Sequence, residues 1–328
     1  MPIIASRTLH LARSARKSLL RTRRRVSRGL HSLKRRNRPA DYGIAPERLI
    51  WIFGSARTGS TWLGAMMADL EGHAWWHEPM VGYLFGHLYY ERARARRRDE
   101  NFILGGDKDL WLNPVRRFVL DSASARFPER VDGGYLVIKE PHGTIGAPLL
   151  AEALPESRMI VLVRDPRDVI SSKMDAAREG SWAEEAQRRR GQEKKNTSAD
   201  SNPDAFVKNQ ARRYVQLIEL AQQAYNAHAG RKVLIRYEDL RAEPLETMRH
   251  IYEKLEILAE DLELARVVEK HAWENIPDSK KGAGKFYRKG SPGGWAEDLT
   301  PEQVETVENI TAPLLERYYA EDRPPPRV

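Results

Sequence analysis

A glycine-rich loop between an apolar run and a helical segment constrains the fold of this 328-residue chain more than any other feature. Residues 49–53 are continuously apolar, as in a strand that is buried on both faces. The loop at residues 54–61 follows directly, and residues 58–70 are predicted to continue it as a helix. A strand that turns through glycines into a helix predicts an α/β fold with the loop at one edge of a sheet.

The alternation of strands and helices continues along the chain. Further strands are predicted at residues 74–76, 134–139, 158–163 and 233–235, and helices at residues 166–177 and 204–228. Thr300 and Gln303 form a capping-box pattern, with Pro301 in the first turn of a terminal helix. Residues 179–203 are polar and poor in apolar residues, so a mobile loop or lid is expected there. The pattern predicts a P-loop-type, three-layer α/β/α fold with a mostly parallel central sheet.

The glycine-rich loop has the features of a phosphate-binding site. Backbone N–H groups and the helix dipole attract an anion to the N-terminus of the following helix. Gly54 and Gly59 have the spacing of a nucleotide-hydrolase phosphate loop, but Ser60 stands where that loop has its Lys. A loop that handles β- and γ-phosphates needs that Lys to neutralise charge. A 5′-phosphate bridged to a sulfate carries less charge, so this loop suits such a group better. A turn that binds no ligand is the alternative.

Two later segments also have anion-binding character. Arg164 ends a predicted strand, and Ser172 lies eight residues on, so both can face a crevice at the sheet edge and bind a terminal phosphate. The third segment contains Arg288, Lys289 and Gly290, two cations before a flexible glycine, which suits a loop that folds over an anion. A structural ion pair for Arg164 and a solvated loop for the third segment are the alternatives.

The basic charge of the chain is confined to its N-terminus. Residues 1–40 hold 13 of the 55 Lys and Arg residues and none of the 46 acids, so residues 41–328 are slightly acidic. The chain has no Cys, which excludes a thiolate nucleophile and Cys-ligated metal sites. We predict a folded domain over 41–328 and a basic arm over 1–40, which is either disordered or a helix on an anionic membrane surface. The apolar runs of a signal peptide or a membrane span are not found, so a cytoplasmic protein is expected, with peripheral membrane attachment as the alternative.

Taken together and in this order, the three segments resemble the PAPS-dependent sulfotransferases, where PAPS is 3′-phosphoadenosine 5′-phosphosulfate. The first, which ends in Ser60-Thr61-Trp62, resembles the 5′-phosphosulfate loop of that family. The second resembles its 3′-phosphate motif, and the third resembles its C-terminal Arg-Lys-Gly loop, here followed by Gly-Gly-Trp instead of Gly-Asp-Trp. The segment that begins at Tyr237 is similar to one whose Tyr lies near the adenine. The resemblance covers residues 49–319.

This resemblance implies a donor site, with PAPS as co-substrate, its product PAP, and no metal. The implied donor-site residues are Ser55, Arg57, Thr58, Gly59, Ser60, Thr61, Trp62, Arg164, Ser172, Tyr237, Arg288, Lys289 and Gly290. Trp62 and Tyr237 would lie beside the adenine, and Arg164 and Ser172 would bind the 3′-phosphate. Arg57 stands where the family often has Lys, and its guanidinium can still neutralise the bridging and sulfuryl oxygens.

The resemblance leaves two candidates for the base that accepts the acceptor proton. Glu78 follows the strand at 74–76 and resembles the Glu-Pro segment of the carbohydrate- and protein-type branches. His142, together with Glu140, follows the next strand and resembles the Lys-x-x-His region of the small-molecule branch, with one extra residue. We favour Glu78, which would need a pKa raised by burial. Lys139 is predicted to stabilise the transferring sulfuryl group.

The acceptor is predicted to be a hydroxyl or amine of a carbohydrate, a lipid or another small molecule. Residues 79–90 supply either an apolar wall for it or a core helix, and the five cations of residues 92–98 form either a solvated face or a site for an anionic acceptor. Two other functions fit parts of the sequence: a nucleotide kinase, and an adaptor that binds membrane through the basic arm, with nucleic acid a less favoured ligand. A homodimer is also compatible with the sequence.

Overall fold

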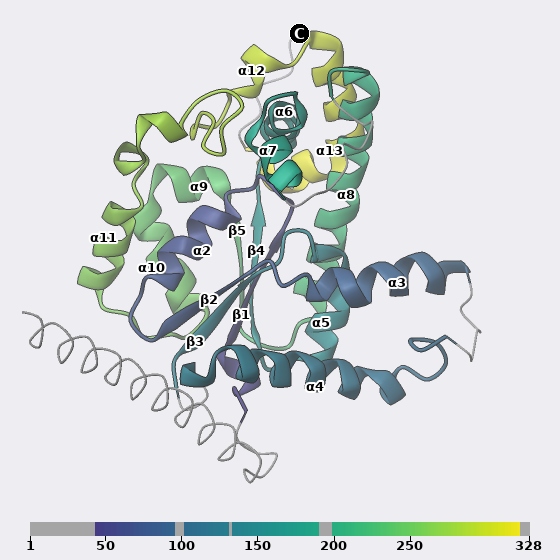
Figure 1. Cartoon of the computed structure of the whole chain (residues 1–328), viewed down its shortest axis with the longest axis vertical. Coiled ribbons are helices and arrows are strands. Elements are labelled where there is room, and N and C mark those ends of the chain that lie inside the picture. The colour runs from purple at the N-terminus through teal and green to yellow at the C-terminus, as the bar shows by residue number, and fades with distance from the viewer. Residues whose placement is uncertain (1–42, 96–101, 131–132, 190–198, 322–328) are drawn as a thin grey trace, which may run out of the picture. The chain divides into compact units, whose positions relative to one another are not determined.

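A five-stranded parallel sheet organises the chain, with its strands in the order β2-β3-β1-β4-β5 (Figure 1). The structure is a computed structural model that describes residues 43–95, 102–130, 133–189 and 199–321. The strands are β1 (Leu49–Gly54), β2 (His73–His77), β3 (Tyr135–Lys139), β4 (Arg158–Val163) and β5 (Lys232–Arg236). All four neighbouring pairs are parallel, so the carboxyl ends of the strands meet at one edge.

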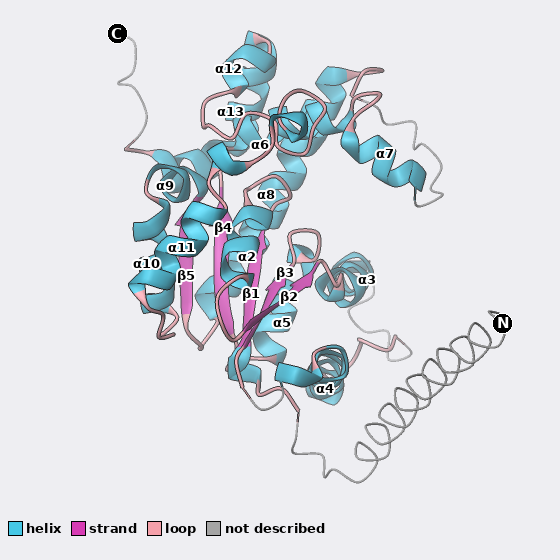
Figure 2. Cartoon of the chain, turned by 60° about the vertical axis from the view of Figure 1, so that its left-hand side comes forward, coloured by secondary structure: helices cyan, strands magenta, loops and turns pink. Residues whose placement is uncertain are grey.

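Helices cover both faces of the sheet (Figure 2). One face carries α2 (Ser60–Ala68), α9 (Tyr237–Ala242), α10 (Pro244–Lys254) and α11 (Asp261–Lys270). The other face carries α3 (Val81–Ala95), α4 (Asp109–Arg126), α5 (Ala147–Ala153) and α8 (Pro203–Ala227). Alternate side chains of β1 enter the two cores, Trp51 and Phe53 on the α8 side and Ile50 and Ile52 on the α2 side. The predicted three-layer α/β/α fold is thus confirmed.

A third apolar cluster joins the helices above the carboxyl edge of the sheet. It packs α6 (Pro166–Ala177) against α8 and α13 (Pro301–Tyr319), with α12 (Trp295–Asp298) alongside. The capping box of Thr300 and Gln303 begins α13 as predicted. Short 3-10 turns complete the described chain: η1 (Pro46–Arg48), η2 (Pro128–Arg130), η3 (Thr144–Gly146), η4 (Trp273–Asn275) and η5 (Asp278–Lys280).

The prediction of a loop over residues 179–203 is wrong for residues 182–189, which form helix α7 (Trp182–Arg189), and residues 190–198 lie outside the described residues. Acidic residues occupy the first turn of this helix and arginines the last, which complements the helix dipole. Glu184 and Arg188 also pair one turn apart. This segment is poor in apolar residues and still forms a helix, because its acidic and basic residues lie at the ends of the helix where their charges stabilise it.

Several predictions fall on parts of the chain that the structure does not describe. The basic arm over residues 1–40 lies outside the described residues, so its conformation and the domain boundary next to it stay predictions. The cation side chains of residues 92–98 also lie outside them. Among the helices that are described, none is both long enough and apolar enough to cross a membrane.

Candidate active site

A cavity of about 170 Å³ lies at the carboxyl edge of the sheet. Segments that follow all five strands contribute to its wall, together with a C-terminal segment. Predicted site residues on the wall are Arg57, Gly59, Ser60, Thr61, Trp62, Glu78, Lys139, His142, Arg164, Ser172, Tyr237, Arg288, Lys289 and Gly290. The two remaining predicted residues, Ser55 and Thr58, are buried within the loop, where the Thr58 hydroxyl donates to the Ser55 carbonyl at 2.8 Å. Predicted residues from six segments that are distant in the sequence therefore share one cavity.

The loop after β1 presents the N-terminus of α2 to this cavity. Helix α2 begins at Ser60, and the Trp62 and Leu63 amides already donate to the Gly59 carbonyl. The ring of Tyr237 packs directly on Gly59 and lies 6.4 Å from the Trp62 ring, nearly edge-on. Trp62 is held by a hydrogen bond from its Nε1 to the His271 carbonyl at 2.8 Å. A helix N-terminus beside two aromatic rings suits a phosphate that is attached to a planar base.

The Arg57 guanidinium joins three of the predicted segments. Its Nε donates to Ser172 Oγ at 2.9 Å, and its Nη2 donates to the Phe286 carbonyl at 2.8 Å. The rings of Trp182 and Phe286 lie 5.4 and 5.0 Å from the guanidinium carbon. Burial, with the nearby charges of Arg164 and Arg288, lowers the pKa of Arg57 to about 10, so the group keeps its charge at neutral pH.

The other predicted cations lie against aromatic rings or carboxylates. Arg164 stacks 4.2 Å above the Tyr237 ring centre and lies 3.5 Å from Asp168. Arg288 forms an ion pair with Asp298, and Lys289 donates to Asp298 at 3.2 Å. These pairs hold the cations in place along the cavity, where an anionic ligand can bind them.

Side chains on one face of α6 bind the C-terminal segment, residues 284–298, which contributes to the cavity wall. The Asp168 carboxylate accepts hydrogen bonds from the Gly293 and Trp295 amides at 2.9 and 3.1 Å. Ser171 donates to Asp298 at 2.7 Å, and Asp175 accepts from the Gly284 amide at 3.0 Å. These side chains are three and four residues apart, so they share one side of the helix. The sequence analysis missed Asp168, Asp175 and Asp298, although the first two lie seven residues, or about two turns, apart on one side of a correctly predicted helix.

Lys139 connects the loop after β1 to the candidate base. Its Nζ lies 2.6 Å from Glu78 Oε1, 2.8 Å from Thr61 Oγ1 and 3.3 Å from His77 Nε2. The Lys139 side chain is only 4% exposed, and burial lowers its pKa despite the Glu78 carboxylate. A hydroxyl from the first turn of α2 and two side chains at the end of β2 therefore meet at one buried ammonium.

The expected rise in the Glu78 pKa is not found. Burial raises it, but the hydrogen bond and the charge of Lys139 outweigh burial, so the net shift lowers the pKa of Glu78. Glu78 also has a left-handed backbone, with φ of 49°, at the turn that leads into α3. The carboxylate is therefore ionised at neutral pH and fixed beside Lys139.

The other two candidates for the base, His142 and Glu140, differ in whether they line the cavity. His142 lines the cavity, and desolvation of its ring lowers its pKa more than the Glu78 carboxylate raises it. Glu140 is fully buried behind the cavity wall, where Oε1 accepts a hydrogen bond from the Val81 amide at 2.8 Å. Burial raises the pKa of Glu140 to about 7. Glu140 thus caps α3 and does not line the cavity.

Several cavity residues were missed in the sequence. They are Trp182, Arg241, His271, Trp273 and Ile276. Arg241 donates to the Gly290 carbonyl at 3.0 Å, beside the Tyr237 hydroxyl, which donates to the same carbonyl at 2.8 Å. Trp182 lies in the predicted loop at residues 179–203, and Arg241 directly follows the segment that begins at Tyr237. The other three lie in segments that no motif marked. Within the described ranges, no group of three or more His, Asp or Glu side chains is placed to hold a metal ion.

Comparison with known structures supports the fold. Mouse sulfotransferase SULT7A1, solved in complex with PAP, is similar with a TM-score of 0.52 and 14% identity over 84% of this chain and 87% of that one. Sulfotransferase STF9 from Mycobacterium avium has a TM-score of 0.47 and 14% identity, over 84% of this chain and 78% of that one. A sulfotransferase from Alicyclobacillus acidocaldarius has a TM-score of 0.44 and 14% identity, over 83% of this chain and 94% of that one. No curated protein matches the chain.

The family assignment comes from a sequence model. The model described as the sulfotransferase family matches residues 50–261, which include the loop after β1, Glu78, Lys139 and the segment from Arg164 to Ser172. The match ends before Arg288, so the third predicted segment lies outside it. A match over this much of the sequence shows that the chain belongs to the sulfotransferase family, as its ordered motifs predicted.

Proposed function

We propose that this sulfotransferase transfers the sulfuryl group of PAPS to a hydroxyl or amine of a carbohydrate, lipid or other small-molecule acceptor. One observation carries the proposal: the Lys139 ammonium contacts both Thr61 of the phosphate-binding loop and the Glu78 carboxylate. A cation in this position can neutralise charge on the group in transfer while the carboxylate beside it receives a proton. The PAP complex of the similar mouse enzyme supports the choice of donor.

On the donor side, each part of PAPS has a matching set of residues. The N-terminus of α2 and Arg57 would bind the 5′-phosphosulfate, and Arg164 and Ser172 would bind the 3′-phosphate. Trp62 and Tyr237 would enclose the adenine, and Arg288, Lys289 and Gly290 would close over the nucleotide. In support, all these groups line the same cavity. Arg57 already contacts Ser172, so the two phosphate subsites adjoin.

The chemical step would be an in-line displacement at sulfur. A lone pair of the acceptor oxygen forms the new S–O bond, while the pair of the bond between sulfur and the bridging oxygen leaves with PAP. The acceptor proton passes to Glu78, which is ionised at neutral pH because Lys139 lowers its pKa. Lys139 stabilises the negative charge that develops on the bridging oxygen. His142 lines the same cavity and is the competing proton acceptor.

The donor assignment can be tested by calorimetry with PAP and, separately, with ATP and Mg²⁺. We expect PAP to bind without metal and Arg164→Ala to weaken it at least tenfold, because the variant removes a charge-assisted contact. Arg249→Ala, an exposed arginine on α10, is the matched control and should leave PAP affinity unchanged. Binding of ATP with Mg²⁺, and none of PAP, would overturn the donor assignment and favour the kinase.

A further inference from the structure

Helix α3 has two apolar stripes, of which only one faces the core. Val81 is buried, and Phe85 and Tyr89 pack against the core cluster beneath the sheet. The second stripe consists of Met80, Leu84 and Leu88, which are 37%, 49% and 43% exposed. Leu84 and Leu88 are four residues apart in α3 and share one side of it. Met80 directly precedes the helix with a left-handed backbone, φ 63°, and its carbonyl accepts from the Leu84 amide at 2.9 Å. We call Met80, Leu84 and Leu88 the outer stripe.

The packing of α3 keeps the outer stripe exposed. Gly82 and Gly86 lie so close to η3 that a Cβ on Gly82 would be 2.0 Å from the Gly143 carbonyl oxygen, and one on Gly86 would be 2.3 Å from Gly146 Cα. The Glu140 carboxylate caps the same end of the helix at the Val81 amide. Because backbone meets backbone on the inner side, α3 cannot roll to bury its second stripe. A helix that is apolar on two sides but buried on one is unusual for a solvated surface.

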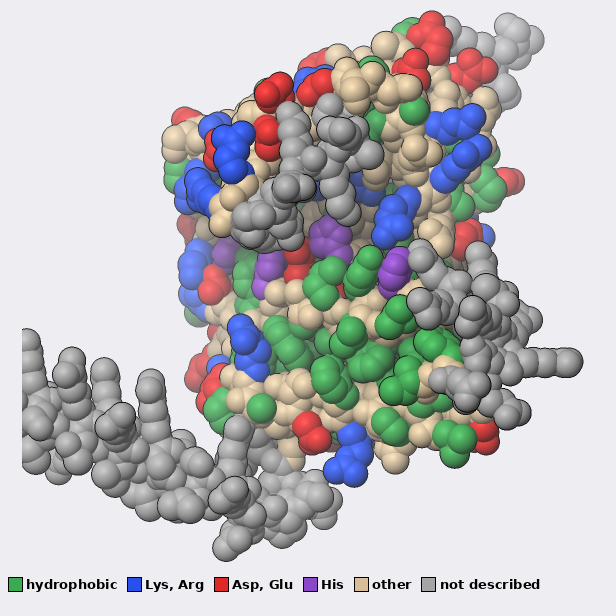
Figure 3. Space-filling model, turned by 45° about the vertical axis from the view of Figure 1, so that its right-hand side comes forward, with side chains coloured by type: hydrophobic (Ala, Val, Ile, Leu, Met, Phe, Trp, Pro, Cys, Tyr) green, Lys and Arg blue, Asp and Glu red, His purple; other side chains and the backbone are tan. Residues whose placement is uncertain are grey.

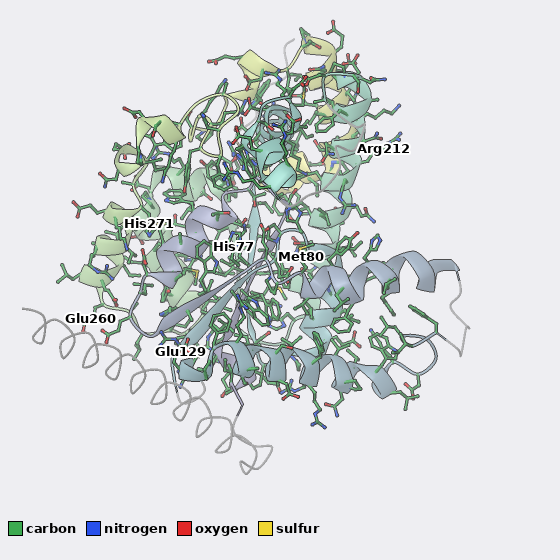
Figure 4. The ribbon with its side chains drawn as sticks, viewed as in Figure 1. His77, Met80, Glu129, Arg212, Glu260 and His271 are labelled. Carbon is green, nitrogen blue, oxygen red and sulfur yellow. The ribbon has the colours of Figure 1, made fainter. Side chains whose placement is uncertain are left out.

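The outer stripe begins beside the candidate base. Met80 is two residues from Glu78, and Figure 4 shows it at the start of α3, near His77 at the end of β2. From Met80 to Leu88 the stripe runs about 12 Å along the helix, at 1.5 Å per residue. Tyr83 stacks on His87 with ring centres 4.6 Å apart and borders the stripe. The stripe is therefore an apolar track that leads away from the catalytic carboxylate.

The surrounding surface extends this apolar character. Phe118 of α4 contacts Phe85 edge-on at 5.4 Å between ring centres and is itself about half exposed. Figure 3 shows hydrophobic side chains gathered over the lower half of this side of the molecule, where α3 and α4 lie, below a band of histidine and acidic side chains. Exposed apolar area of this kind marks a binding surface more often than a solvated one.

We propose that the outer stripe binds the apolar chain of an amphiphilic acceptor whose hydroxyl lies at Glu78. This inference rests on the proposed function, because it assigns the acceptor of the same site. Glu78 lines the cavity, and the stripe begins two residues from that carboxylate. An alkyl or acyl chain laid along it would cover Leu84 and Leu88 while the polar end reaches the base. The stripe would thus select alcohols that carry a chain over short, fully polar ones.

The test uses straight-chain primary alcohols, from methanol to decanol, as probes. Their affinity for the PAP-loaded protein and the rate of alkyl sulfate formation with PAPS are measured for each length. Each methylene buried contributes about 0.8 kcal/mol, so we expect affinity to rise about two- to fourfold per carbon until the stripe is covered. The double variant Leu84→Ser/Leu88→Ser should flatten this dependence while PAP affinity and turnover of methanol stay unchanged.

The chain offers a matched control for this double variant. Leu258 and Leu262 are also exposed leucines four residues apart, and they lie in the α10–α11 region on the other face of the sheet. Leu258→Ser/Leu262→Ser should leave the length dependence intact. The proposal would be overturned if wild-type affinity did not rise with chain length, or if the rise survived in Leu84→Ser/Leu88→Ser.

Other occupants of the stripe would give distinct results. If the stripe contacts membrane, the leucine variant loses binding to phosphatidylcholine vesicles and keeps the length dependence, which overturns the proposal. If it contacts a second copy of the chain, sedimentation shows a dimer that the variant dissociates, again with the length dependence intact. If the wild-type protein neither binds PAP nor forms any alkyl sulfate, the proposed function itself is overturned.

Discussion

Lys139 Nζ lies 2.6 Å from Glu78 Oε1, and the two side chains reach this contact from neighbouring parallel strands. The pair has opposite effects on its two members. The ammonium lowers the pKa of Glu78, while burial lowers the pKa of Lys139 even though the carboxylate opposes that shift. Near neutral pH the pair therefore holds one negative and one positive charge, a proton acceptor beside a stabilising cation.

The proposed role of Glu78 as the base predicts a large loss of turnover in Glu78→Gln. The amide keeps the shape of the side chain but cannot accept a proton, so we expect kcat to fall about a hundredfold to ten-thousandfold. PAP affinity, measured by calorimetry, should change little. His142→Gln is the comparison, and it should retain most of the turnover. The reverse order of effects would move the base to His142.

The pair also predicts the pH profile of kcat/KM. Activity should rise as Glu78 loses its proton, at a pH below its ordinary 4.5, and fall as Lys139 loses its own, below 10.5. In Lys139→Arg the falling limb should move to higher pH, because a guanidinium keeps its proton. Profiles of both proteins with the same acceptor measure the shift. A falling limb that stays in place would contradict control by Lys139.

Glu140 predicts a pH dependence of stability. Its pKa is about 7 in the folded protein and near 4.5 when exposed, so the folded state binds more protons between these values. The free energy of unfolding should therefore decrease as pH rises from about 4.5 to 7, by about 3 kcal/mol from this group, and stay level above it. Urea unfolding at a series of pH values from about 5 to about 8 measures the slope of the free energy of unfolding against pH.

The Glu140→Gln variant isolates this contribution. The amide oxygen can still accept from the Val81 amide, so the cap on α3 is retained while the titration is removed. The slope should be reduced in Glu140→Gln and unchanged in Glu253→Gln, an exposed residue of α10. Equal slopes in wild type and Glu140→Gln would show that this carboxyl does not titrate in that window.

We expect a substitution at Asp168 to weaken donor binding even if Asp168 does not contact the donor, because its carboxylate holds the Gly293 and Trp295 amides. Asn at this position has only one acceptor oxygen and no charge near Arg164, so one of the two amides, of Gly293 or of Trp295, loses its partner. A hydrogen bond of this kind contributes about 1–3 kcal/mol, so the Kd of PAP should rise about tenfold to a hundredfold in Asp168→Asn. Asp261→Asn, on exposed α11, should bind PAP normally. Normal binding by Asp168→Asn would show that α6 does not position the loop.

The sequence predicted those parts of the fold whose pattern is local. The apolar run of β1 and the capping box at Thr300 each sit within a few residues of the element they define. Helix α7 was missed because its stability depends on where its charges fall rather than on an apolar stripe. Local pattern also marked the three segments predicted to bind the donor, and the structure brings residues of all three to one cavity.

What the sequence could not predict depends on contacts between distant residues. The Arg57 guanidinium donates to Ser172, 115 residues away along the chain, and to the Phe286 carbonyl, 229 residues away. Side-chain packing brings these partners together, and no local pattern shows it. The direction of the Glu78 pKa shift was predicted wrongly because burial was considered without the Lys139 ammonium. The two apolar stripes of α3 look alike in sequence, and only the glycine contacts with η3 decide which one is buried.

The strand order separates the catalytic edge into two modules. Segments after β1, β4 and β5 carry the residues assigned to the donor, whereas those after β2 and β3 carry Glu78, Lys139 and the start of α3. Because β2 is an edge strand, the segment from β2 through α3 can diverge without disturbing β1 and β4, which precede most of the residues proposed for the donor. A family built on this edge can therefore evolve new acceptors while it conserves one donor, and a chimaera that exchanges only residues 73–95 would transplant acceptor preference.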